Sequence, residues 1–226
     1  MTAPGGTTGE SPQGAHEGSS MNVVHLSDVA VQAWRNGEGE TRELLAWPLN
    51  ASQDAPLNAP WWCRISVADI TRDGEFSAFP GVDRWFAVIE GGGVDLTFGS
   101  DVVALTSRSA PFRFDGEAAP GCRLPAGPTR DLNLMAQRAS AQGRGRGHGH
   151  GQMQRVLSNA AWQSGADWRG VYAATALSLQ VGKRPAIALP AGTLAWSDRD
   201  ADTPWRATLP TGGTQAWWLG FHRPGA

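Results

Sequence analysis

The chain has 226 residues and a formal net charge of −2, from 19 Lys and Arg against 21 Asp and Glu. This balance excludes the broad basic surface that drives non-specific nucleic-acid binding. No run approaches the roughly 18 consecutive apolar residues of a membrane span, and two cysteines, Cys63 and Cys122, are too few for a disulfide framework. We expect a cytoplasmic protein with free thiols and neither a membrane nor a nucleic-acid partner.

Glycine, proline and tryptophan indicate the fold class. The chain has 29 Gly, 15 Pro and 11 Trp, and the tryptophans fall in short apolar runs between turn residues. Frequent turns between short apolar runs are typical of strands and disfavour long helices. We expect an all-β protein.

The first 20 residues contain mainly Gly, Ser, Thr and Pro and almost nothing that could enter a core. Such a composition predicts a disordered tail over residues 1–20. The folded unit is expected to begin at Met21, and its first lobe to cover residues 21–140.

Strand patterns follow one another within this first lobe. In WCRISVADI, Ile65 and Val67 alternate with Arg64 and Ser66, the period of two of a strand with one apolar and one polar face. Two further runs flank a glycine turn in RWFAVIEGGGVDLTFG, residues 84–99, which predicts a hairpin. Both patterns support a sandwich or barrel.

A glycine-rich stretch, GRGRGHGHG at residues 143–151, separates two series of strand patterns. We expect a flexible connection over residues 141–153, partly because glycines fit a rigid strand poorly. His148 and His150 supply only part of the three or four ligands that a metal site needs, and no glutamate follows Glu117, so we expect no metal and no cofactor. Two arginines without aromatic residues are too few for a nucleic-acid tract.

Residues 154–226 carry a second, shorter strand series that predicts a smaller C-terminal lobe. Within it, LPAGTLAW at residues 189–196 has the strand, Pro-Ala-Gly turn and strand that are common in cupin-like jelly rolls. No sequence repeat relates the two series, which leaves both a repeated β unit and one large sandwich open.

Five motifs stand in a characteristic order and spacing: WRNGEGETRE (34–43), RISVADI (64–70), GEFSAFPGVDR (74–84), PFRFDGE (111–117) and GPTRDLNLMAQR (127–138). With them the chain resembles the HutD/Ves family over about residues 22 to 223. The resemblance implies a cupin-like, two-lobed fold of bicupin type and a regulatory association with bacterial histidine utilisation. The family's first motif usually has three glycines after the Asn, whereas this chain has Gly37, Glu38 and Gly39.

Polar residues within the apolar strands are the candidate binding site. Arginines at a barrel mouth would suit a small carboxylate, since guanidinium binds carboxylate in bidentate fashion. The alternative is internal pairing of Arg64 or Arg84 with Glu43, Asp83 or Asp131, and both can hold at once. We expect Asn36, Thr41 and Glu43 in a turn at the rim, Trp34 as a flat wall and Ser77 as a further donor. The full candidate set is Trp34, Asn36, Thr41, Glu43, Arg64, Ser77, Arg84, Asp131 and Asn133.

Two tryptophan pairs, Trp61/Trp62 and Trp217/Trp218, predict side chains on both faces of their strands, because neighbours in a strand point to opposite faces. The second member of each pair then meets either the other lobe or a homodimer partner. The sequence leaves both open.

The motifs for catalysis are missing. No GxSxG elbow occurs, and neither cysteine has a histidine beside it in sequence. We expect no catalytic residue and a protein that binds a small anionic metabolite, of the urocanate or N-formylglutamate type implied by the resemblance. The alternatives are a metal-independent enzyme acting on such a metabolite and a structural or partner-binding β protein.

Overall fold

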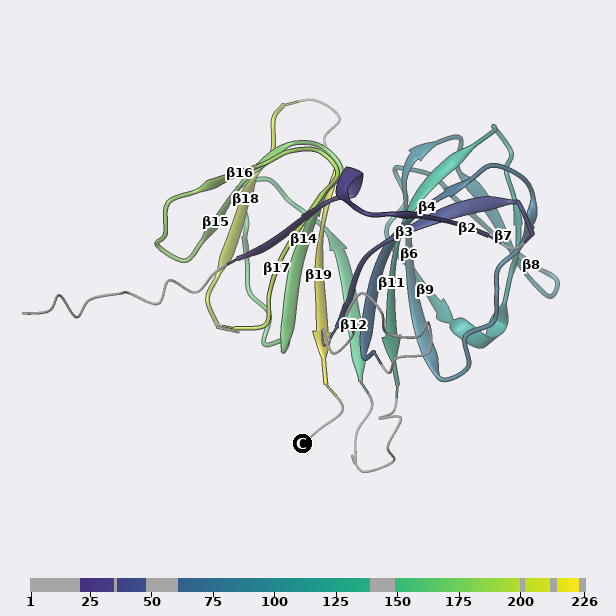
Figure 1. The fold of residues 1–226 in the computed structure, drawn as a ribbon, viewed down its shortest axis with the longest axis horizontal. Coiled ribbons are helices and arrows are strands. Elements are labelled where there is room, and N and C mark those ends of the chain that lie inside the picture. The colour runs from purple at the N-terminus through teal and green to yellow at the C-terminus, as the bar shows by residue number, and fades with distance from the viewer. Residues whose placement is uncertain are drawn as a thin grey trace, which may run out of the picture.

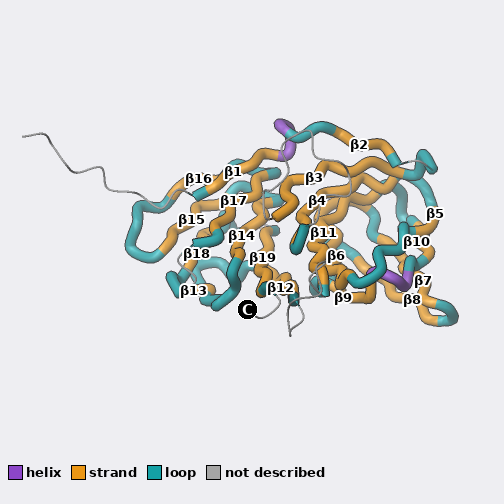
Figure 2. Tube along the Cα trace, turned by 60° about the horizontal axis from the view of Figure 1, so that its bottom comes forward, coloured by secondary structure: helices purple, strands orange, loops and turns teal. Residues whose placement is uncertain are grey.

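The computed structural model describes residues 21–34, 36–47, 61–138, 149–199, 202–211 and 215–223. Strands form most of this trace, and the two helical turns, η1 (Leu26–Asp28) and η2 (Gly116–Ala118), are short (Figure 2). The expected all-β class is confirmed. The expected disordered tail, residues 1–20, lies outside the described residues.

Four antiparallel sheets form two barrels side by side (Figure 1). The large N-terminal sheet contains β2 (Val31–Ala33), β3 (Gly39–Trp47), β4 (Cys63–Ile70), β11 (Thr129–Gln137), β6 (Val82–Gly91) and β9 (Phe112–Asp115), in that order. The small N-terminal sheet contains β5 (Gly74–Glu75), β10 (Gly121–Arg123), β7 (Val94–Phe98) and β8 (Asp101–Leu105).

The C-terminal barrel repeats this pairing of a large with a small sheet. The large C-terminal sheet contains β1 (Asn22–His25), β17 (Thr193–Ser197), β14 (Trp168–Ala173), β19 (Ala216–His222) and β12 (His150–Arg155). The small C-terminal sheet contains β13 (Ala161–Trp162), β18 (Trp205–Thr208), β15 (Leu177–Val181) and β16 (Ile187–Leu189).

The N-terminal segment joins the two barrels. β1 pairs with β17 of the C-terminal barrel, and after η1 the chain enters β2 of the N-terminal barrel (Figure 1). The expected first lobe, residues 21–140, therefore begins with a strand of the other barrel. β1 pairs with β17 over four residues, from Asn22 opposite Trp196 to His25 opposite Thr193.

The predicted hairpin at residues 84–99 is wrong. β6 pairs with β11 and β9 in the large sheet, whereas β7 pairs with β10 and β8 in the small sheet. Gly91 and Gly93 between them have φ of 93° and 87°, and a Cβ on Gly91 would lie 2.3 Å from the Pro128 carbonyl oxygen. The glycines turn the chain at a barrel corner, where any side chain would collide with backbone.

The strand β12 begins at His150, inside the stretch 141–153 that we expected to be a flexible connection. Gly151 pairs with Phe221 in the ladder, and a Cβ on Gly151 would lie 2.4 Å from a methyl group of Leu134. Glycine there permits close approach of the two barrels, so the expectation that glycine is unsuited to a strand is wrong for Gly151. Residues 139–148 lie outside the described residues.

The largest hydrophobic core lies between the barrels. One face of the large N-terminal sheet, with Ile65 and Leu132, packs on Trp168, Trp217 and other side chains of the large C-terminal sheet. Trp217 lies in this shared core, whereas Trp218 lies in the core of the C-terminal barrel. The second tryptophan pair therefore serves packing between and within the barrels of one chain.

Candidate functional site

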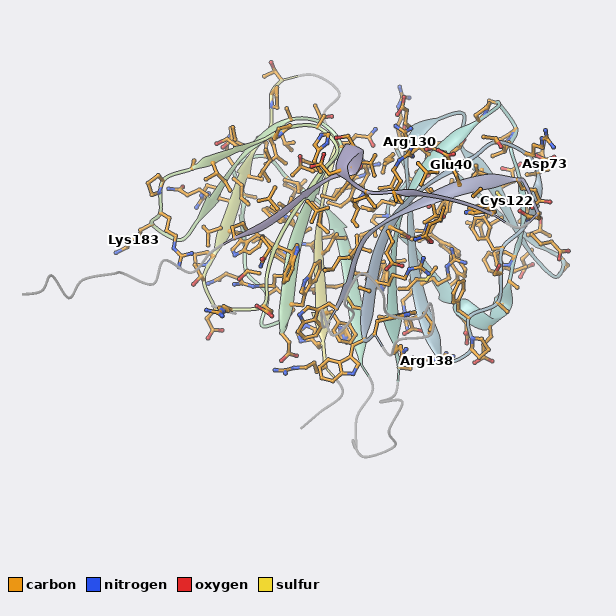
Figure 3. The ribbon with its side chains drawn as sticks, in the orientation of Figure 1. Glu40, Asp73, Cys122, Arg130, Arg138 and Lys183 are labelled. Carbon is orange, nitrogen blue, oxygen red and sulfur yellow. The ribbon has the colours of Figure 1, made fainter. Side chains whose placement is uncertain are left out.

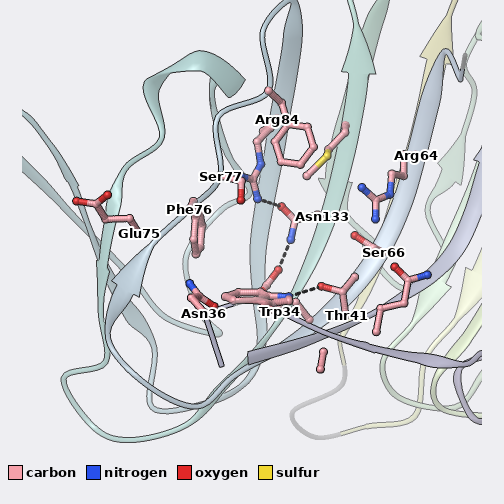
Figure 4. Close-up of a pocket in the computed structure, with 16 residues that line it drawn as sticks. Trp34, Asn36, Thr41, Arg64, Ser66, Glu75, Phe76, Ser77, Arg84 and Asn133 are labelled. Atoms are coloured by element: carbon pink, nitrogen blue, oxygen red, sulfur yellow. Dashed lines mark hydrogen bonds between the residues drawn. The ribbon is translucent and has the colours of Figure 1, made fainter. Parts of the chain in front are cut away.

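A cavity of about 450 Å³ opens in the N-terminal barrel (Figure 4). It lies on the face of the large N-terminal sheet that points away from the core between the two barrels. The alternation in β4 places Arg64 and Ser66 in the cavity, while Ile65 and Val67 enter the core between the barrels. β11 contributes Asp131 and Asn133, and β6 contributes Arg84. The predicted polar face of these strands is confirmed, and it points into the barrel.

Eight of the nine candidate residues line this cavity. They are Trp34, Asn36, Thr41, Arg64, Ser77, Arg84, Asp131 and Asn133. Glu43 does not line it. The expectation of a rim turn is correct for Asn36, which follows β2 and precedes β3, and wrong for Thr41 and Glu43, which lie within β3.

Glu43 acts instead as a partner of Arg64. The Arg64 Nε and Glu43 Oε2 atoms lie 2.5 Å apart, although Nε has no aligned hydrogen bond. The two side chains are 19% and 31% exposed, so the pair is only partly shielded from water. Internal pairing of Arg64 is confirmed, and its guanidinium still borders the cavity (Figure 4).

Arg84 is the most deeply buried cation of the cavity. The residue is 5% exposed, and its Nη2 donates a 2.9 Å hydrogen bond to Asn133 Oδ1 (Figure 4). Its Nε has no hydrogen-bond partner in the described part of the chain. Burial lowers the pKa of Arg84 to about 10, so the guanidinium remains charged at neutral pH.

Three aromatic rings surround the Arg84 guanidinium. Its Cζ lies 4.9, 5.6 and 5.2 Å from the ring centres of Phe76, Phe79 and Phe114, respectively. The rings favour a cation electrostatically but accept no strong hydrogen bond. They therefore hold a positive charge in place without neutralising it.

Asp131 lies in the floor of the cavity but forms no direct ion pair with Arg84. Asn133 stands between them, since its Nδ2 donates to Asp131 Oδ1 while its Oδ1 accepts from Arg84. Burial raises the pKa of Asp131 well above its ordinary value, and the charge of Arg84 acts in the opposite direction. The Asn133 amide separates the two groups, and no carboxylate of the described residues is in direct contact with the Arg84 guanidinium.

The remaining polar residues form the walls. The Trp34 indole donates a 2.7 Å hydrogen bond to the Thr41 hydroxyl, and its ring lies edge-on to Phe76. Asn36 donates to the Glu38 carboxylate, so Glu38 closes the first turn in the place where the family usually has glycine. Ser77 is exposed at the mouth.

The sequence did not single out Ser66, Phe76 or Phe79 as site residues. Ser66 shares the alternating face of Arg64, and that periodicity was a sufficient signal for it. Phe76 and Phe79 precede β6 in a loop, where two phenylalanines are equally typical of a core. No local pattern indicates that they surround a cation.

The C-terminal barrel is filled with aromatic side chains. Trp162 and Trp218 stack with ring centres 4.9 Å apart, and Trp205 meets both edge-on. The buried Arg169 lies 5.2 Å from the Trp205 ring and donates a 2.7 Å hydrogen bond to the Thr203 carbonyl. Arg169 is thus held by a backbone oxygen, in contrast to Arg84.

The two cysteines and two of the histidines were the remaining residues with possible chemical roles. Cys63 and Cys122 are free, as expected, and both are buried. Burial raises the pKa of Cys122 to about 12. His150 and His222 face each other across β12 and β19 with ring centres 4.9 Å apart, and burial together with the charge of His150 lowers the pKa of His222. Among the described residues, no group of three or more His, Cys, Asp or Glu side chains could hold a metal. His148 lies outside them.

No helix in the described ranges is long and apolar enough to cross a membrane.

Comparison with known proteins supports the resemblance found in the motifs. The family model HutD matches residues 26–216. Protein Ves from Citrobacter koseri is 36% identical over 119 residues, which cover 52% of this chain and 59% of that protein. The matched part therefore spans little more than half the length of this curated relative.

Solved structures share the architecture. HutD from Pseudomonas fluorescens SBW25, in a formate condition, superposes with a TM-score of 0.71 and 25% identity over 91% of this chain and all of that one. Protein Ylba from E. coli superposes with a TM-score of 0.59 at 8% identity, over 90% of this chain and 91% of that one. The similarity to Ylba concerns the fold alone. Together, the HutD and Ylba structures confirm the expected cupin-like class.

Proposed function

The chain belongs to the HutD family, and from that premise we propose that its N-terminal barrel binds a small carboxylate without transforming it. Binding of a pathway intermediate would moderate histidine utilisation, for example by sequestering an inducer. Urocanate and N-formylglutamate are the candidate ligands.

The observation that carries this proposal is the state of Arg84. A buried guanidinium costs free energy unless charged or strongly polar partners compensate it. Among the described residues, Arg84 has one hydrogen bond, to a neutral amide, and three aromatic rings around it. A carboxylate in the cavity would supply the missing counter-charge and accept hydrogen bonds from the guanidinium.

Neighbouring groups would also suit a small carboxylate. Arg64 provides a second cation on the same wall, and Ser66 and Thr41 provide hydroxyl groups. The aromatic ring of Trp34 offers a surface for a planar ligand such as an imidazole.

The test is a thermal-shift and turnover experiment on the purified full chain with formate, urocanate and N-formylglutamate. A ligand present at about 100 times its Kd stabilises the folded state by about 2.7 kcal/mol. The proposal predicts a saturable rise in Tm with at least one of the three and no product by chromatography. Turnover of a ligand would instead assign a metal-independent enzyme, and no shift with any of them would favour a structural or partner-binding protein.

A further inference from the structure

The cavity of the N-terminal barrel contains a buried acid as well as a buried cation. Asp131 is 1% exposed and Arg84 is 5% exposed, and both line the cavity. They do not contact each other, because the side chain of Asn133 accepts from Arg84 and donates to Asp131. Of the hydrogen bonds among the described residues, only the one from Asn133 reaches the Asp131 carboxyl, on Oδ1. The second carboxyl oxygen therefore has no donor within the described part of the chain.

The arginines on the strand of Asp131 are held by other carboxylates. Arg130 and Arg138 lie at the two ends of β11 (Figure 3). Arg130 Nε donates a 2.6 Å hydrogen bond to Asp69, and Arg138 Nη1 donates a 2.8 Å hydrogen bond to Asp115. Neither Asp69 nor Asp115 lines the cavity. Asp131 thus forms no ion pair with an arginine of its own strand.

The Asp131 carboxyl can serve as a donor or as an acceptor. Burial raises its pKa well above the ordinary value, and the charge of Arg84 acts in the opposite direction. A protonated carboxyl donates one hydrogen bond, whereas an ionised one only accepts. An imidazole ring suits both states, because one of its nitrogens donates an N–H and the other accepts. A phenyl ring has neither group.

A flat aromatic wall lies beside this acid. The Trp34 indole donates its N–H to the Thr41 hydroxyl at 2.7 Å, and its ring stands at 87° to the ring of Phe76. These two contacts fix the plane of the indole. In the view of Figure 4, Asn133 lies between Arg84 and Trp34. A planar ligand that reaches Arg84 with one end can therefore stack on Trp34 with the other.

The register of the strands sets the separation between the cation and the acid. Asp131, Asn133 and Met135 are alternate residues of β11. Arg84 on β6 is paired with Met135, and its guanidinium reaches back along β11 to Asn133. Asn133 is two residues from Asp131, which is about 7 Å along a strand. That separation suits a ligand with a short, rigid linker between its carboxylate and its ring.

We propose that the cavity selects a planar acid whose carboxylate is joined to an azole ring, and that Asp131 recognises the ring nitrogen. The inference rests on the proposed function, because the carboxylate of this ligand binds Arg84. The ring stacks on Trp34, and one of its nitrogens shares a proton with the Asp131 carboxyl. The Asn133 amide keeps the acid and the cation apart, so each is available to a different end of the ligand.

The experiment compares urocanate with cinnamate, its phenyl counterpart, by calorimetric titration of the full chain. Both are planar acrylates with one carboxylate, and they differ in the ring. Burial of apolar area alone would favour cinnamate, because its phenyl ring is larger and less polar. We expect the wild type to bind urocanate at least about tenfold more tightly than cinnamate, because the hydrogen bond to Asp131 is charge-assisted.

Asp131→Asn removes the acid and keeps an acceptor for Asn133. The readout is the ratio of the two Kd values, because a change of charge near the carboxylate acts on both ligands alike. We expect this ratio to fall to within about threefold, since a neutral amide forms a weaker hydrogen bond than a carboxyl that shares a proton. Glu75→Gln changes the other acid that lines the cavity, which is exposed, and should leave the ratio at its wild-type value.

The outcomes separate this inference from the proposed function. Cinnamate binding as tight as urocanate binding in the wild type would overturn the inference and leave a carboxylate site in place. A ratio that Asp131→Asn leaves unchanged would also overturn it, because Asp131 would then only orient Asn133. Absence of binding by formate, urocanate and cinnamate alike would overturn both proposals. The wild-type comparison needs no variant, so it decides the matter even if Asp131→Asn does not fold.

Discussion

Arg84 Nη2 and Asn133 Oδ1 are joined by a 2.9 Å hydrogen bond, the one hydrogen bond that the described part of the chain gives to this buried guanidinium. Asn133 in turn donates to Asp131, whose pKa burial raises well above its ordinary value. The groups in direct contact with the Arg84 guanidinium are a neutral amide and three aromatic rings. An arginine that ties strands together would be paired with a carboxylate, whereas the contacts of Arg84 leave its guanidinium available to a ligand.

Replacement of Arg84 by Met should leave the fold intact. Methionine fills a similar volume among the three rings, and the change removes a buried charge whose hydrogen-bond partner is neutral. We expect the free energy of unfolding, measured in urea, to fall by no more than about 1 to 3 kcal/mol, because the buried Asn133 Oδ1 loses its donor while the removal of a buried charge offsets part of that cost. A loss of about 3 to 5 kcal/mol would instead identify Arg84 as an internal ion-pair tie.

Arg169→Met is the matched comparison for a buried arginine. Arg169 donates to the Thr203 carbonyl oxygen at 2.7 Å, so its removal leaves a backbone acceptor unpaired. We expect a cost of about 1 to 3 kcal/mol in the same urea experiment. Carboxylate binding by this variant should persist, because the C-terminal barrel holds Arg169 outside the cavity.

Glu43→Gln should strengthen carboxylate binding. The Glu43 carboxylate lies 2.5 Å from Arg64 Nε and competes with a ligand for that guanidinium. Because the pair is partly exposed, its loss should cost less than about 1 kcal/mol of stability. Calorimetry should show a lower Kd for the Glu43→Gln chain than for the wild type, and a higher one would contradict this role of Glu43.

Asp131→Asn should change the pH dependence of stability. Burial raises the pKa of Asp131 in the folded chain above its unfolded value. The stability linked to its protonation is therefore fully present below the unfolded pKa and is lost as pH rises through the folded pKa. Because asparagine does not ionise, the stability of the variant relative to the wild type should increase with pH.

Denaturant unfolding of both chains at about pH 5 and about pH 8 measures this difference. An ionised Asp131 would repel an anionic ligand, so carboxylate affinity of the wild type should fall as Asp131 ionises. The Asp131→Asn chain should not show this fall. A stability difference between the variant and the wild type that falls as pH rises would show that Asp131 is ionised in the folded state.

Trp217→Ala should destabilise both barrels together. Trp217 is fully buried in the core that the two large sheets share. Truncation of a buried tryptophan costs about 3 to 5 kcal/mol. Because the core is shared, calorimetric unfolding of the variant should remain a single transition at lower Tm. Two separate transitions, with only one shifted, would show that the barrels unfold independently.

Local periodicity was sufficient to predict much of the site. The alternation of Arg64 and Ser66 with Ile65 and Val67 correctly separated a polar face from a packed face, because side chains of a strand alternate strictly. The same holds for Asp131 and Asn133 on β11. Pairing of Arg64 with Glu43 was foreseen as well, but as one of several alternatives.

Sheet assignment could not be predicted in this way. Gly91–Gly93 read as a hairpin turn, whereas the flanking strands join different sheets. Likewise β1 pairs with β17, more than 160 residues away in sequence. Such pairings depend on long-range packing, which a window of neighbouring residues does not record. For the same reason the rings of Phe76, Phe79 and Phe114 around Arg84 had no signal in the sequence.

Calorimetric titration of formate into the wild-type, Arg84→Met and Arg169→Met chains tests the central claim most directly, because formate offers a carboxylate and little else. We expect saturable binding to the wild-type and Arg169→Met chains and none to Arg84→Met, with all three folded by circular dichroism. Equal binding by the wild-type and Arg84→Met chains, or no binding by the wild type, would contradict a carboxylate site at Arg84.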